Sequence, residues 1–179
     1  SINFMVMLIL AIVVFGLAVT LTYRFMQQAY ATQKDLDQQT RAQILDALDT
    51  GAKVAVIPDS INIRSGKSDV VGIGIRNIRD DSNDFKINVA FSDAFDKDGN
   101  DLQDPPQDWF VYPTTKTIKK FERDIARVAF GIPGGTKAGT YIYDVMVCPE
   151  TAAYCEADPS NAPTQAYDQQ IHKIYVYVS

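Results

Sequence analysis

The first charged side chain of this chain is Arg24, and the residues before it, Ser1 to Tyr23, are uncharged and mostly aliphatic. About 22 helical residues extend roughly 33 Å, which is enough to cross the hydrocarbon core of a bilayer. No basic residues precede this segment and no small-residue cleavage site follows it, so it differs from an ordinary secretory signal. The chain begins with Ser rather than Met, and we therefore expect a cut on the N-terminal side that keeps the segment in the mature protein.

The same segment is expected to continue as one helix to about residue 50, because no Pro interrupts it and the only Gly before Gly51 is Gly16. Beyond Arg24 the composition becomes polar, although apolar residues recur near helical spacing. These apolar residues are Phe25, Ala29, Leu36, Ile44, Leu45 and Leu48. The expected organisation is a helix over residues 1–51, with a hydrophobic core or transmembrane part (1–23) and an amphipathic extension (24–50), followed by a head domain over 52–179.

After Gly51 the hydrophobic period changes from 3.6 to 2, which indicates strands. For example, Val71, Ile73 and Ile75 alternate with Gly72, Gly74 and Arg76. The predicted strands are Lys53–Ile57, Ser60–Arg64, Val70–Asn77, Phe85–Phe95, Trp109–Tyr112, Arg123–Ile132, Thr140–Val147 and His172–Val178. Short strands separated by turn residues, without helix patterns between them, predict an antiparallel β-sandwich, for which we favour immunoglobulin-like topology. The predicted class is therefore α+β.

Charge and residue content argue against several functions. The formal net charge is −5 and no basic stripe is interleaved with aromatics, so we expect no nucleic-acid partner. His172 is the only histidine, and no nucleophile motif or phosphate-binding loop accompanies it, so we expect no enzyme, cofactor or metal.

The stretch from Asp93 to Asp101 begins like a calcium loop, but its glycine falls fourth from Asp96 rather than sixth. A solvated hairpin is the better interpretation, with a weak surface calcium site as the alternative.

Cys148 and Cys155 bracket a short loop, and in an extracellular protein we expect them to form a disulfide. Closing such a loop constrains the unfolded chain by roughly 2–3 kcal/mol in the entropic model. A metal ion bound by the two cysteines is disfavoured because two further ligands are missing, and free thiols remain as the other alternative.

A group of late tyrosines has two interpretations, cross-strand packing or contact with a neighbouring molecule. These are Tyr141, Tyr143, Tyr167, Tyr175 and Tyr177.

A charge-free apolar helix, an amphipathic continuation and a sandwich head together resemble archaeal members of the type IV pilin superfamily, which include adhesive pilins and archaellum filament subunits. The stretch from Gly131 to Val147 is similar to a hairpin frequent in archaeal surface immunoglobulin-like domains. Met5 stands where bacterial type IV pilins typically carry glutamate, and no archaellin-specific signature occurs over residues 1–19, which favours a pilus over a motility filament. The resemblance implies an extracellular adhesive filament that is a homopolymer of identical subunits, inserted in the membrane before assembly, with a cell or solid surface as its adhesion target.

The physics of such a subunit is consistent with the sequence. A helix satisfies its own backbone in lipid, and the same apolar side chains can later pack against copies of themselves. Small residues permit close approach, and contacts that repeat by translation give an open polymer. The residues expected to form the assembly helix are Ile2, Phe4, Leu8, Ala11, Ile12, Phe15, Gly16 and Val19. The alternatives are a membrane-anchored immunoglobulin-like surface protein, similar to an archaellum stator component, and a motility filament subunit.

Overall fold

The computed structural model describes residues 5–16, 36–81, 83–102, 109–157 and 162–179. Residues 5–16 are helical, and two further helices and nine strands lie in the rest of the described chain. The two helices are α2 (Gln38–Asp49) and α3 (Ala162–Gln165). The strands are β1 (Val54–Ile57), β2 (Ser60–Ile63), β3 (Ser68–Arg76), β4 (Asp84–Asp96), β5 (Phe110–Val111), β6 (Thr115–Thr117), β7 (Arg123–Gly131), β8 (Gly139–Pro149) and β9 (His172–Val178).

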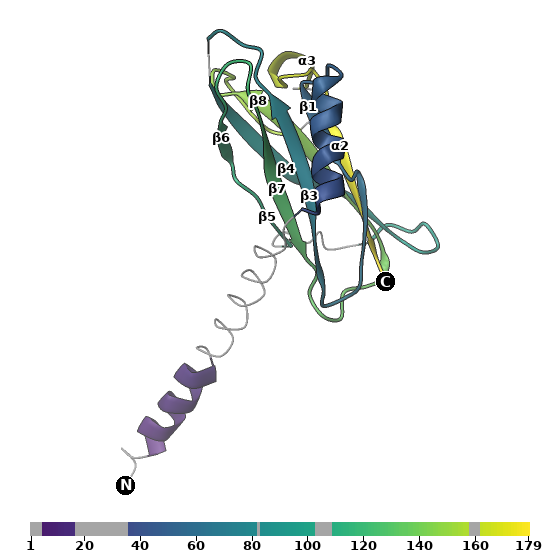
Figure 1. The fold of residues 1–179 in the computed structure, drawn as a ribbon. Coiled ribbons are helices and arrows are strands. Elements are labelled where there is room, and N and C mark those ends of the chain that lie inside the picture. Colours follow the sequence, from purple (N-terminus) through teal and green to yellow (C-terminus); the bar gives the residue numbers. More distant parts are fainter. Residues whose placement is uncertain (1–4, 17–35, 82, 103–108, 158–161) are drawn as a thin grey trace.

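The strands form two sheets packed face to face (Figure 1). Sheet A has the order β1-β3-β7-β5, and sheet B has the order β2-β9-β8-β4-β6. Neighbouring strands are antiparallel except for β2, which lies parallel to β9. The chain changes sheets between β1 and β2, at the Ile57–Pro58 peptide bond. This arrangement confirms the predicted immunoglobulin-like β-sandwich.

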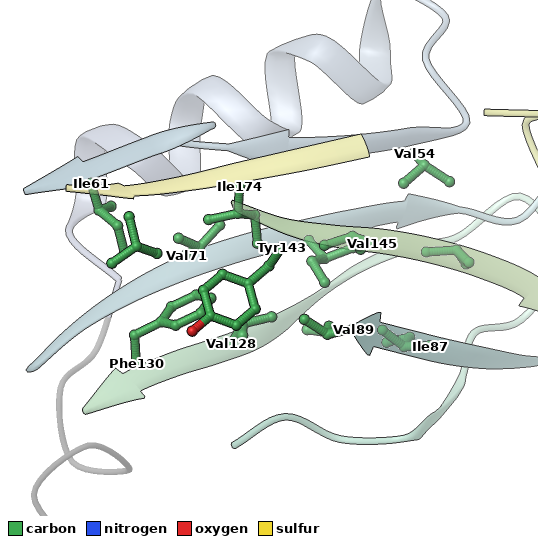
Figure 2. Packing of buried hydrophobic residues seen from close by; sticks show 14 of the residues in the cluster. Val54, Ile61, Val71, Ile87, Val89, Val128, Phe130, Tyr143, Val145 and Ile174 are labelled. Carbon is green, nitrogen blue, oxygen red and sulfur yellow. The ribbon is translucent and has the colours of Figure 1, made fainter. Parts of the chain in front are cut away.

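The core lies between the sheets and consists of the inward members of each alternating strand (Figure 2). Val71 and Ile73 of β3 face Tyr143 and Val145 of β8, and all four are fully buried. Burying side chains of this size is worth about 1.5–3 kcal/mol each relative to leaving them in water. The period of 2 therefore places the sandwich core correctly.

Helix α2 packs on the outer face of sheet A, where its residues Ile44 and Leu48 are fully buried (Figure 1). Gly72 and Gly74 of β3 point toward these side chains, and a Cβ at either position would collide with Ile44. The absence of side chains at the two glycines thus creates the space that the helix occupies. β3 is consequently buried on both of its faces.

The prediction of one continuous helix over residues 1–50 is wrong. Helix α2 begins at Gln38, and Asp37 before it has an extended backbone with φ −64° and ψ 159°. The carboxylate of Asp37 accepts a hydrogen bond of 2.6 Å from the backbone N–H of Thr40, which makes it an N-cap. Asp side chains favour such a start over continuation of a helix. No long hydrophobic helix occurs in the described residues, and the first part of the predicted amphipathic extension, residues 24–35, lies outside them.

The eight predicted strands are all present with boundaries shifted by a few residues, but β6 was missed. Its sequence is Thr-Lys-Thr, which carries no apolar alternation, and it forms the edge of sheet B by pairing with Asp84–Lys86 of β4. The short helix α3 was also missed because it contains a single turn.

Candidate functional site

Helical residues 5–16 carry five of the predicted assembly residues: Leu8, Ala11, Ile12, Phe15 and Gly16. Ile2, Phe4 and Val19 lie outside the described residues. All twelve residues from 5 to 16 are uncharged and exposed, and the exposed fractions of Leu8, Ile12 and Phe15 are 47%, 63% and 71%. A helix that is apolar on every face is normally covered by protein or lipid. Within the described chain, none of the helices has both the length and the apolar character needed to cross a membrane.

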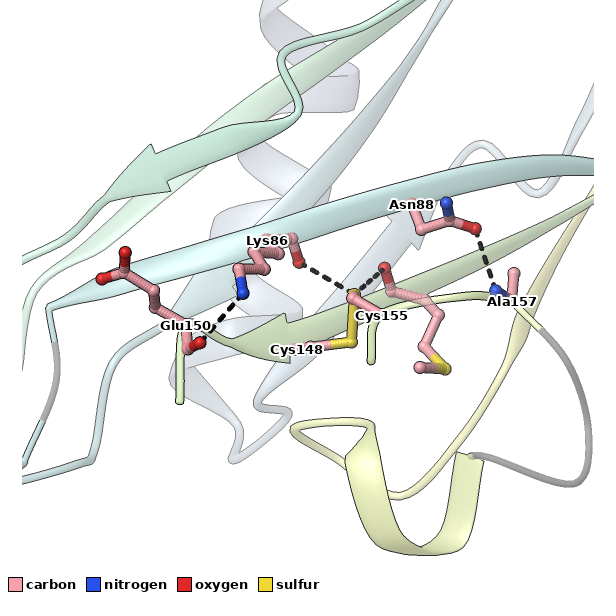
Figure 3. The surroundings of a disulfide bond; sticks show 7 residues. Lys86, Asn88, Cys148, Glu150, Cys155 and Ala157 are labelled. Atoms are coloured by element: carbon pink, nitrogen blue, oxygen red, sulfur yellow. Dashed lines mark hydrogen bonds between the residues drawn. A yellow bond between two sulfur atoms is a disulfide. The ribbon is translucent and has the colours of Figure 1, made fainter. Parts of the chain in front are cut away.

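Cys148 and Cys155 form a disulfide with their Cα atoms 5.9 Å apart, as the sequence predicted (Figure 3). Cys148 and Met146 of β8 face outward from sheet B, yet both are fully buried, because the disulfide loop and α3 cover them. The backbone N–H of Ala157 donates to the Asn88 side chain of β4 at 2.9 Å (Figure 3). The disulfide thus holds a loop over one half of the outer face of sheet B.

The acidic stretch between Asp93 and Asp101 comprises the last residues of β4 and the turn after them, which closes where Phe95 and Asp101 form an antiparallel bridge. Both carboxylate oxygens of Asp96 accept hydrogen bonds within the loop, among them 2.9 Å bonds from the backbone N–H groups of Asp98 and Asn100. Hydrogen bonds from Asn100 lower the pKa of Asp96. Among the described residues, no three His, Cys, Asp or Glu side chains are grouped to hold a metal ion. The geometry is that of a closed turn.

His172 lies at the start of β9, where its Nε2 atom is 2.6 Å from a carboxylate oxygen of Asp168. The next residue, Lys173, donates to the buried carboxylate of Asp144 on β8 at 2.6 Å. Each pair joins β9 to an adjacent segment. A structural role therefore accounts for both.

The tyrosines divide between the two interpretations. Tyr141, Tyr143 and Tyr167 are buried, and the ring of Tyr143 lies 5.0 Å from that of Phe130 in an aromatic group between the sheets. The hydroxyl of Tyr167 donates to the Arg76 carbonyl at 2.9 Å. Tyr175 is half-buried and Tyr177 is 41% exposed, both on β9. Cross-strand packing therefore explains the first three, and the last two remain available for an intermolecular contact.

No protein-family model matches the chain, and no curated protein matches it. Among solved structures, it is similar to the ASH/PapD-like domain 7 of human CEP192, with a TM-score of 0.44 and 13% identity over 71% of this chain and 85% of that one. It is also similar to WR4, an MSP family member of C. elegans (TM-score 0.39, 10% identity, 72% and 99% coverage). A third likeness is to the CsuC–CsuE chaperone–tip adhesion subunit complex of Acinetobacter baumannii (TM-score 0.37, 15% identity, 71% and 56% coverage). These likenesses concern the immunoglobulin-like fold alone.

The assignment to the archaeal type IV pilin superfamily is wrong. It required a long hydrophobic helix at the N-terminus, and the described residues contain none. The resemblance depended on a continuous helix, whereas the chain starts a new helix after the Asp37 cap. It also depended on a hairpin between Gly131 and Val147, but this stretch runs from the last residue of β7 in sheet A into β8 in sheet B, so it connects the two sheets instead of forming a hairpin.

Proposed function

We propose that this chain is a structural subunit of an extracellular filament with an adhesive role, which polymerises through its N-terminal apolar segment and is held in the membrane before assembly. The observation that carries the proposal is the helix over residues 5–16, whose side chains are uncharged and exposed. The sandwich has a complete core of its own and covers none of them. Lipid before assembly, and copies of the same helix afterwards, would remove this surface from water.

The energetics favour self-association. Each large aliphatic or aromatic side chain that becomes buried contributes roughly 1.5–3 kcal/mol. Ten residues of this kind occur between Met5 and Phe15, so relative to water their burial contributes about 15–30 kcal/mol, against an estimated 4–15 kcal/mol lost in translational and rotational freedom on association. This comparison applies to the segment outside the membrane, because lipid covers the same side chains and gives no hydrophobic drive between helices. The apolar face provides affinity without direction, and contacts repeated by translation give an open polymer.

The disulfide supports an extracellular location. Disulfides persist in oxidising compartments and are rare in the cytosol. The bond joining Cys148 to Cys155 holds a surface loop in place, which fits a stabilising role outside the cell.

The test is a single charge in the apolar helix with a matched control on the sandwich. Val13 and Val111 are both exposed, by 55% and 42%, so the same substitution to Asp can be compared at the two positions. After detergent removal, the wild-type chain and Val111→Asp should pellet as polymer and appear as filaments by negative-stain microscopy. Val13→Asp should remain unpolymerised with an unchanged circular dichroism spectrum, because a buried unpaired charge is costly. Normal assembly of Val13→Asp would refute the proposal.

A membrane-anchored immunoglobulin-like surface protein is the second candidate. The cap at Asp37 favours it, because the apolar segment and α2 do not form the single rigid rod that a continuous helix would provide. Shearing of cells distinguishes the two. A filament subunit is released as detergent-free polymer of high mass, whereas an anchored protein stays with the membranes until detergent is added.

A further inference from the structure

One end of the sandwich carries exposed apolar side chains on a rigid frame, here called the distal tip and defined as residues 77–81 and 118–122. Asn77 is fully buried at its centre and donates from Nδ2 to the Ile118 carbonyl at 2.7 Å. Its side-chain oxygen accepts from the backbone N–H of Arg79 at 2.8 Å, and its carbonyl accepts from Phe121 N–H at 2.7 Å. The two loops are therefore bonded to each other through one buried side chain.

Phe121 is the third residue of a turn that the Glu122 backbone N–H closes on the Lys119 carbonyl at 2.9 Å, and the turn places this bulky residue in an unfavourable conformation. Its φ is 64°, in the left-handed region that bulky residues avoid, and its side chain is 70% exposed. Ile78 of the neighbouring loop is 43% exposed. Strained residues of this kind persist mainly where they serve a function, and an exposed aromatic is a frequent anchor at interfaces.

A second apolar surface, exposed at Tyr177 and half-buried elsewhere, lies on the outer face of sheet B. Tyr177, Thr140 and Phe95 are directly paired across β9, β8 and β4, and the adjacent row includes Tyr175 and Ile142. We call Phe95, Ile142, Tyr175 and Tyr177 the sheet-B strip. The disulfide loop and α3 cover the other half of this face but leave the strip partly exposed.

The tip and the strip lie at opposite ends of the same strands. At the tip end, Phe85 of β4 pairs with Pro149 of β8, and Asn83 beside it accepts from the Ile118 backbone N–H at 2.7 Å. At the other end of both strands, Phe95 pairs with Thr140. The tip of one copy could therefore meet the strip of a second copy while its own strip stays free for a third.

We propose that the distal tip of one copy packs on the sheet-B strip of the next copy, with Phe121 and Ile78 as the inserted side chains. The contact joins two different surfaces, so it is heterologous and propagates as an open chain. It rests on the proposed filament function and assigns the contact between its head domains. Lys119, two residues before Phe121, is exposed at the tip, and Asp93 is exposed opposite Ile142, so one cation of the tip can meet one carboxylate at the margin of the strip.

The charges around the tip favour a second copy over a lipid surface. Anionic membranes attract clusters of Lys and Arg. The tip has no such surplus, because three basic residues are matched by three acidic ones. These are Arg79, Lys119 and Lys120 against Asp80, Asp81 and Glu122.

The first test compares two Gly substitutions in the full chain. Gln169 is the other described non-glycine residue with positive φ, also 64°, and it is exposed. Both Phe121→Gly and Gln169→Gly relieve the backbone, so each should unfold at a slightly higher urea concentration than wild type. Only Phe121→Gly should weaken head-domain association, by about tenfold, the size expected for loss of an aromatic anchor. Equal association of both variants and wild type would overturn the proposal.

The second test maps the contact by photo-crosslinking, with p-benzoylphenylalanine in place of Phe121. Crosslinked peptides should come from β8 and β9 of another copy, and Tyr177→Ser should lower their yield. Crosslinks to lipid, to residues 5–16 or to another face, or no crosslinks at all, would overturn the proposal.

The same crosslinking in detergent micelles separates this proposal from the filament itself. Detergent covers the apolar helix, so the tip and strip can meet in concentrated solution even without polymer. Tip–strip crosslinks without filaments would contradict the proposed function and support the contact. Filaments without these crosslinks would support the proposed function and contradict the tip–strip contact.

Discussion

The contact between helix α2 and sheet A yields a quantitative prediction at Gly74. A Cβ at this position would overlap Cγ2 of Ile44 and lie 3.0 Å from Cδ1 of Leu48. The Ile44 Cγ2 atom is bonded directly to Cβ, so it cannot swing away as the end of a long side chain could. Gly74→Ala must therefore shift the helix. Overpacking of this kind costs roughly 1–3 kcal/mol, and the gain from replacing Gly in a strand returns about 0.5–1 kcal/mol, so we expect a net loss of about 1–2 kcal/mol.

A double-mutant cycle isolates this overlap. Ile44→Ala alone removes a fully buried side chain and should cost about 2–5 kcal/mol. It also removes the Cγ2 atom, so adding Gly74→Ala in that background should cost nothing further. The expected coupling is about 1–3 kcal/mol. Gly134→Ala is the matched control, because a Cβ there meets no atom within 4 Å.

Urea unfolding of the full chain in a mild non-ionic detergent measures these free energies. Trp109 is the only tryptophan and its ring centroid lies 4.7 Å from that of Tyr141, so its fluorescence reports the sandwich core. Hydrogen exchange of the α2 amides provides a local measurement, and Gly74→Ala should accelerate it. If Gly74→Ala lowers the free energy of unfolding equally in the wild-type chain and in the Ile44→Ala background, the overlap argument is refuted.

Three further predictions concern single groups. The non-reduced chain should be lighter by two hydrogens than its reduced form, and reduction of the bond at Cys148 should lower the free energy of unfolding by about 2–3 kcal/mol. Tyr143→Phe should leave the unfolding free energy unchanged or slightly higher, because that hydroxyl is buried without a hydrogen-bond partner among the described residues, whereas Tyr167→Phe should lower it by about 1 kcal/mol. Hydrogen bonds from Thr40 lower the pKa of Asp37, so its capping contribution is present above about pH 4 and is lost as pH falls through the folded-state pKa. Exchange of the Thr40 amide should therefore accelerate in acid, and Asp37→Asn should remove this dependence.

The sandwich could be predicted because its signal is local. Along β4, Phe85, Ile87 and Val89 alternate with polar residues, and the structure buries these three between the sheets. The disulfide was likewise expected from two nearby cysteines in a chain with an apolar N-terminal segment. Both features depend on neighbours in sequence, which a single sequence displays directly.

The course of the N-terminal region depends on competition between local signals. The absence of Pro and Gly favoured a continuous helix, but one Asp side chain bonding to a backbone N–H three residues ahead was enough to start a new one. No Glu or Gln stands three residues after Asp37 to form a capping box, so the common sequence signature of a helix start is absent. The pair Gly72 and Gly74 on one face of a strand was a usable signal that another element packs there. The structure shows that this element is helix α2, whose Ile44 and Leu48 pack against the two glycines.

The strain at Phe121 could not be predicted, because a turn that needs positive φ at its third residue normally carries Gly or Asn there, whereas the turn from Lys119 to Glu122 carries Phe. The turn is also held by the carbonyl of Asn77, which is 44 positions away in the chain and is itself buried by the fold. Functional surfaces that are built against local preference are therefore the features that sequence analysis misses first.

The placement of α2 connects the apolar segment to the sandwich mechanically. Leu36, just before the helix, packs against Val70 and Ala129 at one end of sheet A. At the other end the Arg76 guanidinium donates to the Leu48 carbonyl at 3.1 Å, and the last turn also forms an ion pair with β7. Force applied through the apolar segment in the proposed filament would thus reach sheet A along the full length of the helix. It would enter at the end of the sandwich opposite the distal tip, because Leu36 packs beside Val70 at that end whereas Arg76 adjoins the tip.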